Sequence, residues 1–502
     1  MISSAAFAEE EGTRSVVEGN LVNRTTPLHH LRRSPSSPNR GEDRREANPR
    51  WTLFCCILAS SLSFVDASVL NVALPAIKAG YGAGAEQAQW VINAYLLPLS
   101  ALLLLGGAVG DHYGRRRLLV IGTSLFGLAS LTCALAPTLP VLLAARAIQG
   151  IGAALLLPNS LALLNAAFSG EQRGRAVGIW AAAGAAAAAL APLIGGWLVG
   201  TVGWPTIFYI NLPLALGAIL LAIRFVEESR EPDAGRSDYK GALLTTGGLG
   251  GLTYGLTLWS AHGHAGRTAV IAIIIGTLLI GGFLRVEHRR GNSGMMPLQL
   301  FASRCFSGLN LLTFLLYGAF GAAMLLIPYV LISSGGYSPA QAGLALLPLP
   351  IVMATASPSM GGLAARIGPR LPLAIGPLIV AIGLLLSWFI GMQTGYWQGL
   401  FPAILVMALG MTIAVAPLTA AVLGSVEERH VAMASGFNSA VARTGGLIAT
   451  ALLGAALAES GAALFGAFHV AMTVSAAVSG LASVVALTML PGVRMANSSY
   501  RT

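Results

Sequence analysis

The sequence has 502 residues, of which 55% are hydrophobic and only 10% are charged. With a mean hydropathy of +0.72, it is too apolar for an ordinary soluble protein of one to three domains. The formal net charge of +10 would suit a nucleic-acid partner, but the arginines gather on one side of the hydrophobic segments, so no such partner is expected. The composition indicates an integral membrane protein embedded in the lipid bilayer.

The chain begins with a polar segment, residues 1–50, which is rich in Arg, Glu, Ser and Pro. This segment lacks the apolar stretch that a signal peptide requires. We therefore expect a disordered cytosolic tail, and a contact between its arginines and anionic lipids is the alternative.

Long apolar segments follow one another after this tail. A transmembrane helix needs about 17–25 apolar residues, and the segments lack the alternation of a membrane barrel strand. Helices are required because lipid offers an open backbone no hydrogen-bond partner. We predict an all-α integral membrane protein with fourteen transmembrane helices, at 52–75, 87–109, 117–136, 140–164, 175–200, 205–224, 240–260, 268–286, 307–333, 341–362, 371–391, 398–422, 431–456 and 463–490.

The connections between these segments differ in charge. If the N-terminus faces the cytosol, the cytosolic connections include "DHYGRRR", "SGEQRGR" and "RVEHRRGNSG", whereas the opposite connections carry only Lys78 and Arg267. Positive charge is retained on the cytosolic side of membranes. Both termini of this multi-pass protein are therefore expected in the cytosol, with the body in the cell (inner or plasma) membrane.

Two short stretches suggest an internal duplication. "GAVGDHYGRR" at 107–116 resembles "GGLAARIGPR" at 361–370, with Gly and Arg in step. Two six-helix halves that rock about a central site are typical of transporters. The expected domains are a cytosolic tail at 1–50, a six-helix bundle at 51–225, a cytosolic link with two extra central helices at 226–290, a second six-helix bundle at 291–490 and a cytosolic tail at 491–502.

Four motifs carry a family resemblance. "GAVGDHYGRRRLL" is similar to the loop signature G-x-x-x-D-[RK]-x-G-[RK]-[RK] of the major facilitator superfamily, with His112 in place of a basic residue. "RAIQGIGAALLLP" resembles its fourth-helix motif, and "VDASVLNVALP" resembles the first-helix motif of the fourteen-helix drug:proton antiporters.

The fourth motif is "AAAAALAPLIGGWL", which is similar to the antiporter signature G-x-x-x-G-P-x-x-G-G. Pro192, Gly195 and Gly196 match it, whereas Ala187 and Ala191 stand where the signature has glycine. The resemblance implies a major facilitator fold and antiport. Small residues here would let neighbouring helices pack closely, and Pro192 can kink the helix.

The loop after the second helix is a candidate gate. Asp111 with Arg115 and Arg116 would form a charged latch at the cytosolic surface, while Gly107 and Gly114 would permit a tight turn and a close approach. The resemblance implies that this loop stabilises an outward-open state. The alternative is a simple positive anchor at the membrane surface.

Asp66 is the acidic residue that the predicted spans place deepest in the membrane. An ionised carboxylate there costs at least about 2.5–3.5 kcal/mol. Arg146 falls at the same depth by helix rise. Burial favours a neutral carboxyl and a nearby arginine favours an ionised one, so we expect the pair to couple proton movement. A static ion pair that holds the first and fourth helices together is the alternative.

Polar and aromatic residues in the spans suggest a substrate cavity. The candidates are Asn93, Tyr95, Gln149, Trp180, Tyr317, Asn438 and Arg443. Arg443 has no acid at its depth in the second half. It would therefore meet backbone carbonyls or an anionic group of the substrate, or serve in packing.

The sequence predicts a proton-coupled secondary transporter that exports hydrophobic or amphipathic small molecules by alternating access. Transport of a specific metabolite, and a non-transporting sensor or scaffold, are the alternatives. No enzyme motif is found, so no catalytic residue, cofactor or metal is expected and the proton gradient supplies the energy. The expected partners are the substrate, protons and lipid, with a periplasmic adaptor suggested by family analogy alone.

Overall fold

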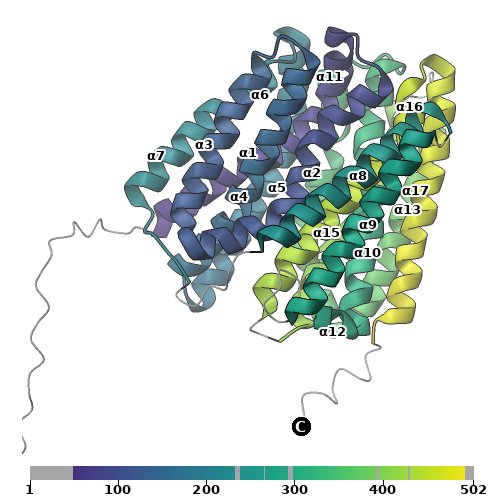
Figure 1. Cartoon of the computed structure of the whole chain (residues 1–502). Helices are drawn as coiled ribbons and strands as arrows, with labels where there is room; N and C mark the ends of the chain where they lie inside the picture. The colour runs from purple at the N-terminus through teal and green to yellow at the C-terminus, as the bar shows by residue number, and fades with distance from the viewer. Residues whose placement is uncertain are drawn as a thin grey trace, which may run out of the picture. The chain divides into compact units, whose positions relative to one another are not determined.

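The computed structural model describes residues 49–231, 238–264, 266–291, 298–391, 395–427 and 430–491, all within one compact unit, Arg45–Thr502. Within these residues every regular element is a helix (Figure 1). The predicted cytosolic tails, 1–50 and 491–502, lie almost wholly outside the described residues.

The first half forms an N-terminal bundle. Its helices are α1 (Pro49–Tyr81), α2 (Ala85–Tyr113), α3 (Arg115–Ala134), α4 (Leu139–Ala167), α5 (Gly170–Thr201), α6 (Thr206–Tyr209) and α7 (Asn211–Phe225). The short α6 and the longer α7 together occupy the sixth predicted span. Pro205 precedes the pair, where its fixed backbone angle suits a helix start.

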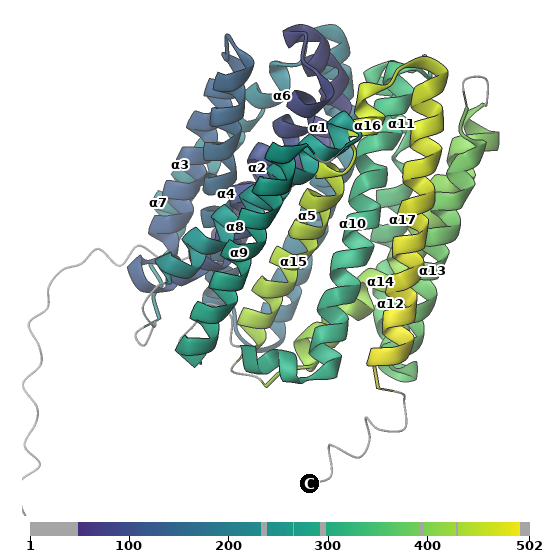
Figure 2. The same ribbon diagram turned by 45° about the vertical axis from the view of Figure 1, so that its right-hand side comes forward.

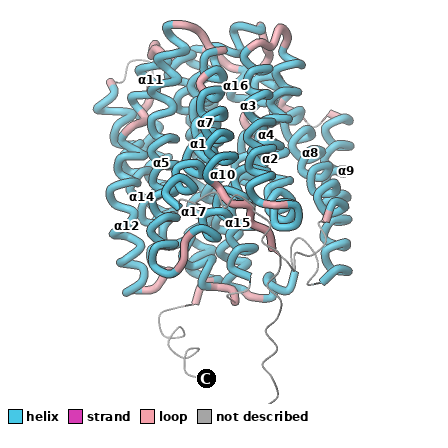
Figure 3. The backbone as a smooth tube through the Cα atoms, turned by 90° about the vertical axis from the view of Figure 1, so that its left-hand side faces the viewer, coloured by secondary structure: helices cyan, strands magenta, loops and turns pink. Residues whose placement is uncertain are grey.

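The second half forms a C-terminal bundle, and a helix pair stands between the halves in sequence. The pair is α8 (Tyr239–His262) and α9 (Arg267–Arg290), which lies beside α2 (Figure 3). The C-terminal bundle comprises η2 (Leu298–Ala302), α10 (Arg304–Ser333), α11 (Pro339–Ala345), α12 (Pro348–Ile367), α13 (Arg370–Leu386), η3 (Ser387–Phe389), η4 (Tyr396–Leu400), α14 (Phe401–Gly424), α15 (Val431–Ala451), α16 (Gly454–Ala458) and α17 (Gly461–Met489) (Figure 2).

Twelve helical stretches among the described residues are both long enough and apolar enough to cross a membrane. The predicted spans at 240–260 and 431–456 are not among them, although both are helical as α8 and α15. Gly and Thr dilute the hydropathy of α8, and Asn, Ser and Arg dilute that of α15. With 24 and 21 residues, the two helices are about 36 and 32 Å long, which matches a core of about 30 Å.

The helices alternate in direction, so the body has two ends. We call the end with Arg115, Arg116, Arg290 and Arg370 the arginine-rich end. We call the opposite end, with Lys78, the Lys78 end. One buried apolar cluster extends from the C-terminal bundle into the Lys78 end of the N-terminal bundle, where it includes Leu70, Leu74, Ile77 and Val91. A separate cluster fills the N-terminal bundle nearer the arginine-rich end and includes Cys55, Leu62, Leu99 and Phe126. The two bundles therefore share a core at the Lys78 end.

Close contact between α2 and α4 depends on glycines. A Cβ atom added at Gly106 would lie 2.1 Å from the carbonyl oxygen of Ala154, and one at Gly110 would lie 1.7 Å from the side-chain oxygen of Asn159. At Gly107 the nearest atom is a side-chain carbon of Pro158 at 3.5 Å, an ordinary contact. The close approach that the sequence suggested for Gly107 is instead made by Gly106 and Gly110. Of the three glycines, only these two face the backbone and the Asn159 amide of α4.

Gly106 and Gly107 provide a matched pair for testing this packing. Gly106→Ala should lower stability by about 1–3 kcal/mol because the added methyl overpacks the interface. Gly107→Ala should leave stability unchanged or slightly raised, since alanine is the better helix former. Thermal unfolding of the detergent-solubilised protein, followed by size-exclusion chromatography, measures both. Equal melting temperatures for the two variants would contradict the assignment.

Candidate functional site

Asp66 and Arg146 are in direct contact inside the N-terminal bundle. Arg146 Nη1 donates to Asp66 Oδ2 at 2.5 Å. Gln149, one turn further along α4, accepts from Arg146 Nη1 at 2.7 Å and donates to Asp66 Oδ1 at 2.9 Å. Both carboxylate oxygens therefore accept a hydrogen bond from α4.

Groups on the surrounding helices hold the cluster of Asp66, Arg146 and Gln149, called here the Asp66–Arg146 centre, in place. Arg146 Nε donates to the carbonyl oxygen of Val91 at 3.1 Å, and its guanidinium lies over the Tyr95 ring, 4.4 Å from the ring centroid. Gln149 Nε2 also donates to the hydroxyl of Ser130 at 2.8 Å, and Asn211 donates to the same hydroxyl at 3.0 Å. Five helices, α1 to α4 and α7, thus converge on one ion pair.

The centre is closed to solvent in this conformation. Asp66 is 1% exposed and Arg146 is 0% exposed. Within the described residues Arg146 Nη2 is buried without a hydrogen-bond partner. A buried pair of this kind is costly to break from one side because the remaining charge is left without compensation.

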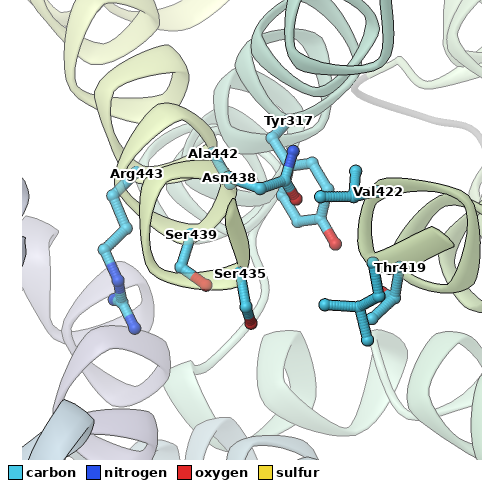
Figure 4. A pocket seen from close by; sticks show the side chains of 9 residues that line it. Tyr317, Thr419, Val422, Ser435, Asn438, Ser439, Ala442 and Arg443 are labelled. Carbon is cyan, nitrogen blue, oxygen red and sulfur yellow. The ribbon is translucent and has the colours of Figure 1, made fainter. Parts of the chain in front are cut away.

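A separate cavity of about 340 Å³ lies in the C-terminal bundle (Figure 4). Three predicted cavity residues line it, Tyr317, Asn438 and Arg443. The other lining residues are Thr419, Val422, Leu423, Ser435, Ser439 and Ala442. These residues belong to the last turns of α14, the first four turns of α15 and the middle of α10. The cavity therefore lies between the middle of the membrane and the arginine-rich end.

The remaining predicted cavity residues lie elsewhere. Asn93, Tyr95 and Gln149 are buried within the N-terminal bundle. The Tyr95 hydroxyl is 2.6 Å from the hydroxyl of Ser63, and Trp180 Nε1 donates to Ser60 at 2.9 Å. In this conformation these four side chains therefore lie among neighbouring helices and do not line the cavity.

The predicted gating loop is ordered by a partner segment that sequence reasoning missed. Arg115 binds Asp111 at 2.7 Å, as the pattern suggested. The carboxylate of Glu228, just after α7, accepts from the backbone amides of Arg116 and Arg117 at 3.0 and 3.3 Å. An acid at a helix N-terminus is favourable, so Glu228 stabilises the start of α3.

Gly114 makes this arrangement possible. Its φ is 114°, a region that disfavours side chains, and a Cβ atom there would lie 2.7 Å from the Glu228 carboxylate. Glu231 also donates its backbone amide to the carbonyl oxygen of Asp111 at 3.0 Å. The only sequence signal for this partner was the acidic content of the link after α7.

The small residues of α5 form a close contact with both bundles. A Cβ atom at Gly195 would lie 1.8 Å from a Val69 methyl on α1. At Gly196 it would lie 2.3 Å from the carbonyl oxygen of Pro339 on α11. Conversely, a Cβ atom at Gly343 on α11 would lie 2.2 Å from the carbonyl oxygen of Pro192. The motif therefore brings the two bundles together near the Lys78 end.

Lys78 adds a polar closure at the same end. Its ammonium donates to the Tyr329 hydroxyl at 2.8 Å and to the Leu457 carbonyl oxygen at 2.6 Å. Both acceptors belong to the C-terminal bundle. The sequence analysis did not predict this contact. The signal for it was a lone lysine in the connections that otherwise carry only Arg267.

The extra helix α8 joins this closure from the flank. The Ser260 hydroxyl donates to the Ala451 carbonyl oxygen at 2.8 Å and accepts from the Gly454 backbone amide at 3.0 Å. Gln89 on α2 donates to the Thr450 carbonyl oxygen at 2.8 Å. The end of α15 is thus held by the N-terminal bundle and by α8 together.

Comparison with known protein families shows which family of membrane proteins this chain belongs to. Residues 56–307 and 309–499 match the model of the Major Facilitator Superfamily. The chain belongs to this superfamily. It is therefore a multi-pass membrane transporter rather than a soluble protein, as its composition and helices indicated.

Several relatives are drug resistance proteins. Multidrug resistance protein Stp of Mycobacterium tuberculosis is 34% identical over 414 residues, covering 81% of this chain and 75% of that protein. The methylenomycin A resistance protein of Bacillus subtilis is 33% identical over 405 residues, covering 80% and 86%. The tetracenomycin C resistance and export protein of Streptomyces glaucescens is 29% identical over 432 residues, covering 85% and 78%.

Solved structures share the fold at low identity. A POT family transporter in complex with a thioalcohol-conjugated peptide superposes with a TM-score of 0.65 at 14% identity, covering 88% of this chain and 95% of that one. The xylose transporter XylE from E. coli gives a TM-score of 0.61 at 16% identity, covering 88% and 99%. The predicted two-bundle fold is thus that of the superfamily.

A double-mutant cycle tests the Asp66–Arg146 centre. Asp66→Asn should destabilise the protein by about 3–5 kcal/mol, the usual cost of an uncompensated buried charge. Arg146→Gln should cost less, because a carboxyl can take up a proton and become neutral whereas a guanidinium stays charged. The double variant should be more stable than Asp66→Asn alone. Thermal unfolding gives all four values, and strict additivity would rule out the coupling.

Proposed function

We propose that this chain exports hydrophobic or amphipathic small molecules in exchange for protons. The observation that carries this is the buried acid Asp66, which is shut into one bundle beside Arg146 while the open cavity lies in the other. A carboxyl group enclosed at membrane depth beside one arginine suits a proton carrier. The names of the relatives support drug efflux as the direction and class of transport.

The orientation of the protein in the membrane follows from the distribution of its arginines. We assign the arginine-rich end to the cytosol, with both termini inside and fourteen crossings of the cell membrane, because arginines are retained on the cytosolic side. On this assignment the structure is closed to the outside by Lys78 and the α5–α11 contact. The cavity then faces inward, where it would collect substrate.

Proton binding would drive the change of access. In the closed centre both carboxylate oxygens of Asp66 accept a hydrogen bond from α4. Protonation would weaken the bond to Arg146, since a neutral carboxyl is a poorer acceptor for a cation. Arg146 packs against Tyr95 and the backbone of α2. A change at Asp66 would therefore reach the helices that contact the other bundle.

Transport in proteoliposomes tests this role. With an acidic lumen, the wild type should accumulate dye from outside as protons leave, and a protonophore should abolish the accumulation. Three dyes of different charge serve as probes: fluorescein, rhodamine 123 and Nile red. The double variant Asp66→Asn/Arg146→Gln keeps neutral hydrogen-bonding groups in place, so it should fold yet only equilibrate the dye. Undiminished accumulation by that variant would refute proton coupling at Asp66.

Lys78 provides a test of alternating access. Lys78→Met keeps the side-chain length but removes two charge-assisted hydrogen bonds, so the state open at the Lys78 end should gain population by about tenfold or more. Spin labels at Leu135→Cys and Ala458→Cys report the separation of the bundles at that end in pulsed electron paramagnetic resonance. Lys240→Met, which removes an exposed lysine at the opposite end, is the matched control. An unchanged distance distribution in Lys78→Met would contradict a sealing role.

A further inference from the structure

Arg443 is a cation with no counter-charge among the residues that the structure describes. It lines the cavity in the C-terminal bundle. Within the described residues its guanidinium makes no hydrogen bond or ion pair, in contrast to Arg146, which has Asp66 and Gln149. Figure 4 shows its side chain leaving α15 and extending away from Tyr317 toward the helices of the N-terminal bundle. The guanidinium is therefore available to a ligand between the bundles.

The depth of Arg443 in the membrane makes the lack of a counter-charge costly. It lies twelve residues after Val431, the first residue of α15, which is about 18 Å of helix rise within a hydrocarbon core of about 30 Å. Arginine near the middle of a membrane is expensive, and such residues normally pair or line a functional path. A partner that arrives with the substrate would account for a cation that this protein leaves unpaired.

The surrounding groups suit an anion. Ser435 and Ser439 precede Arg443 by two turns and one turn of α15, and both line the same cavity. Thr419 adds a third hydroxyl from α14, and Asn438 is tethered to α10 through Thr313 at 2.7 Å. Among the described residues the lining includes no acid. A cationic compound would meet Arg443 with nothing to offset the repulsion, whereas a carboxylate could accept two parallel hydrogen bonds from the guanidinium.

We propose that Arg443 binds an anionic group, such as a carboxylate, of the exported compound, so that the substrates are amphipathic anions. This assignment rests on the proposed export function and names its substrate class. The apolar remainder of the compound would lie against Val422, Leu423 and Tyr317. The hydroxyls of Ser435 and Ser439 would supply further donors to the same anionic group.

Tyr95 places this site next to the proton centre. Arg443 lies on α15, which packs against α2, the helix of Tyr95, and it lines the cavity together with Tyr317 of α10. The Tyr95 ring also lies under the guanidinium of Arg146. An anion bound at Arg443 would therefore act on the helix that carries Tyr95, and through Tyr95 on Arg146 and Asp66.

The charge of the substrate has an electrical consequence. For each proton exchanged, export of a monoanion moves two charges across the membrane, whereas export of a neutral compound moves one and export of a monocation moves none. Accumulation of an anion should therefore respond to an imposed membrane potential as well as to a pH gradient.

Two dyes with one scaffold test the assignment. Fluorescein carries a carboxylate, and rhodamine 123 is a cationic xanthene in which that carboxylate is esterified. Fluorescence anisotropy with the purified full chain in lipid nanodiscs, against empty nanodiscs, measures binding of each. The wild type should bind fluorescein at least tenfold more tightly than rhodamine 123. Arg443→Gln should lose tenfold or more of the fluorescein affinity, as expected for a charge-assisted contact.

Two further variants complete the experiment. Arg443→Lys keeps the charge but loses the planar fork, so its fluorescein affinity should fall between the wild type and Arg443→Gln. Arg267→Gln removes an exposed arginine at the start of α9 and should bind both dyes as the wild type does. If Arg443→Gln does not fold, the dye preference of the wild type and the Arg443→Lys value still decide.

The outcomes separate this inference from the proposed function. Equal binding of the two dyes, a preference for rhodamine 123, no fluorescein binding at all, or full fluorescein affinity in Arg443→Gln would each overturn the anion site, even where pH-driven transport is present. Fluorescein binding that depends on Arg443, together with transport that ignores a pH gradient, would uphold the site and refute proton-coupled export.

Discussion

The structure depends on one constraint: a charge held at membrane depth needs a partner, because lipid supplies none. Asp66 and Arg146 meet it by pairing, and Gln149 occupies the second carboxylate oxygen and the same guanidinium nitrogen. Five helices of the N-terminal bundle are arranged around that pair. The same constraint makes Arg443 informative, since it lies at a comparable depth and has no such partner among the described residues.

The closure at the Lys78 end uses two kinds of contact that suit repeated opening. Gly196 and Gly343 bring backbones together through van der Waals contact, which leaves no unsatisfied polar group when it separates. Lys78 adds hydrogen bonds to a hydroxyl and a carbonyl rather than to an acid, so opening exposes no orphaned carboxylate. The helix α8 reaches the same region through Ser260. An added helix pair thus takes part in the seal.

Sequence alone predicted where most helices lie and that Asp66 would meet Arg146, because helix rise fixes depth. It missed the breaks that divide the predicted helices at 205–224, 341–362 and 431–456. Sequence alone could not show which face of each helix is turned toward a cavity and which toward a neighbouring helix. Inside a membrane bundle a polar side chain such as Asn93 can face a cavity or a neighbouring helix, and the hydropathy pattern is the same for both. Choosing between Gly106 and Gly107 needs the facing backbone of α4. Glu228 was not predicted because its hydrogen bonds go to backbone amides, which leave no mark in the residue pattern, and because its ion pairs with Arg116 and Arg117 join segments far apart in the sequence.

The two halves of the duplicated sequence have diverged in their charged residues, and the difference suggests that the two bundles serve different roles. In the repeat of the gating loop, Arg370 corresponds to Arg116, but no acid stands where the first copy has Asp111. Arg370 instead donates to the backbone carbonyl of Leu487. The described spans of the C-terminal bundle likewise hold no counterpart to Asp66. The acid lies in one bundle, and the cation without a partner among the described residues lies in the other. The two can influence each other through α2, since its Tyr95 packs on Arg146 and the helix itself packs against α15.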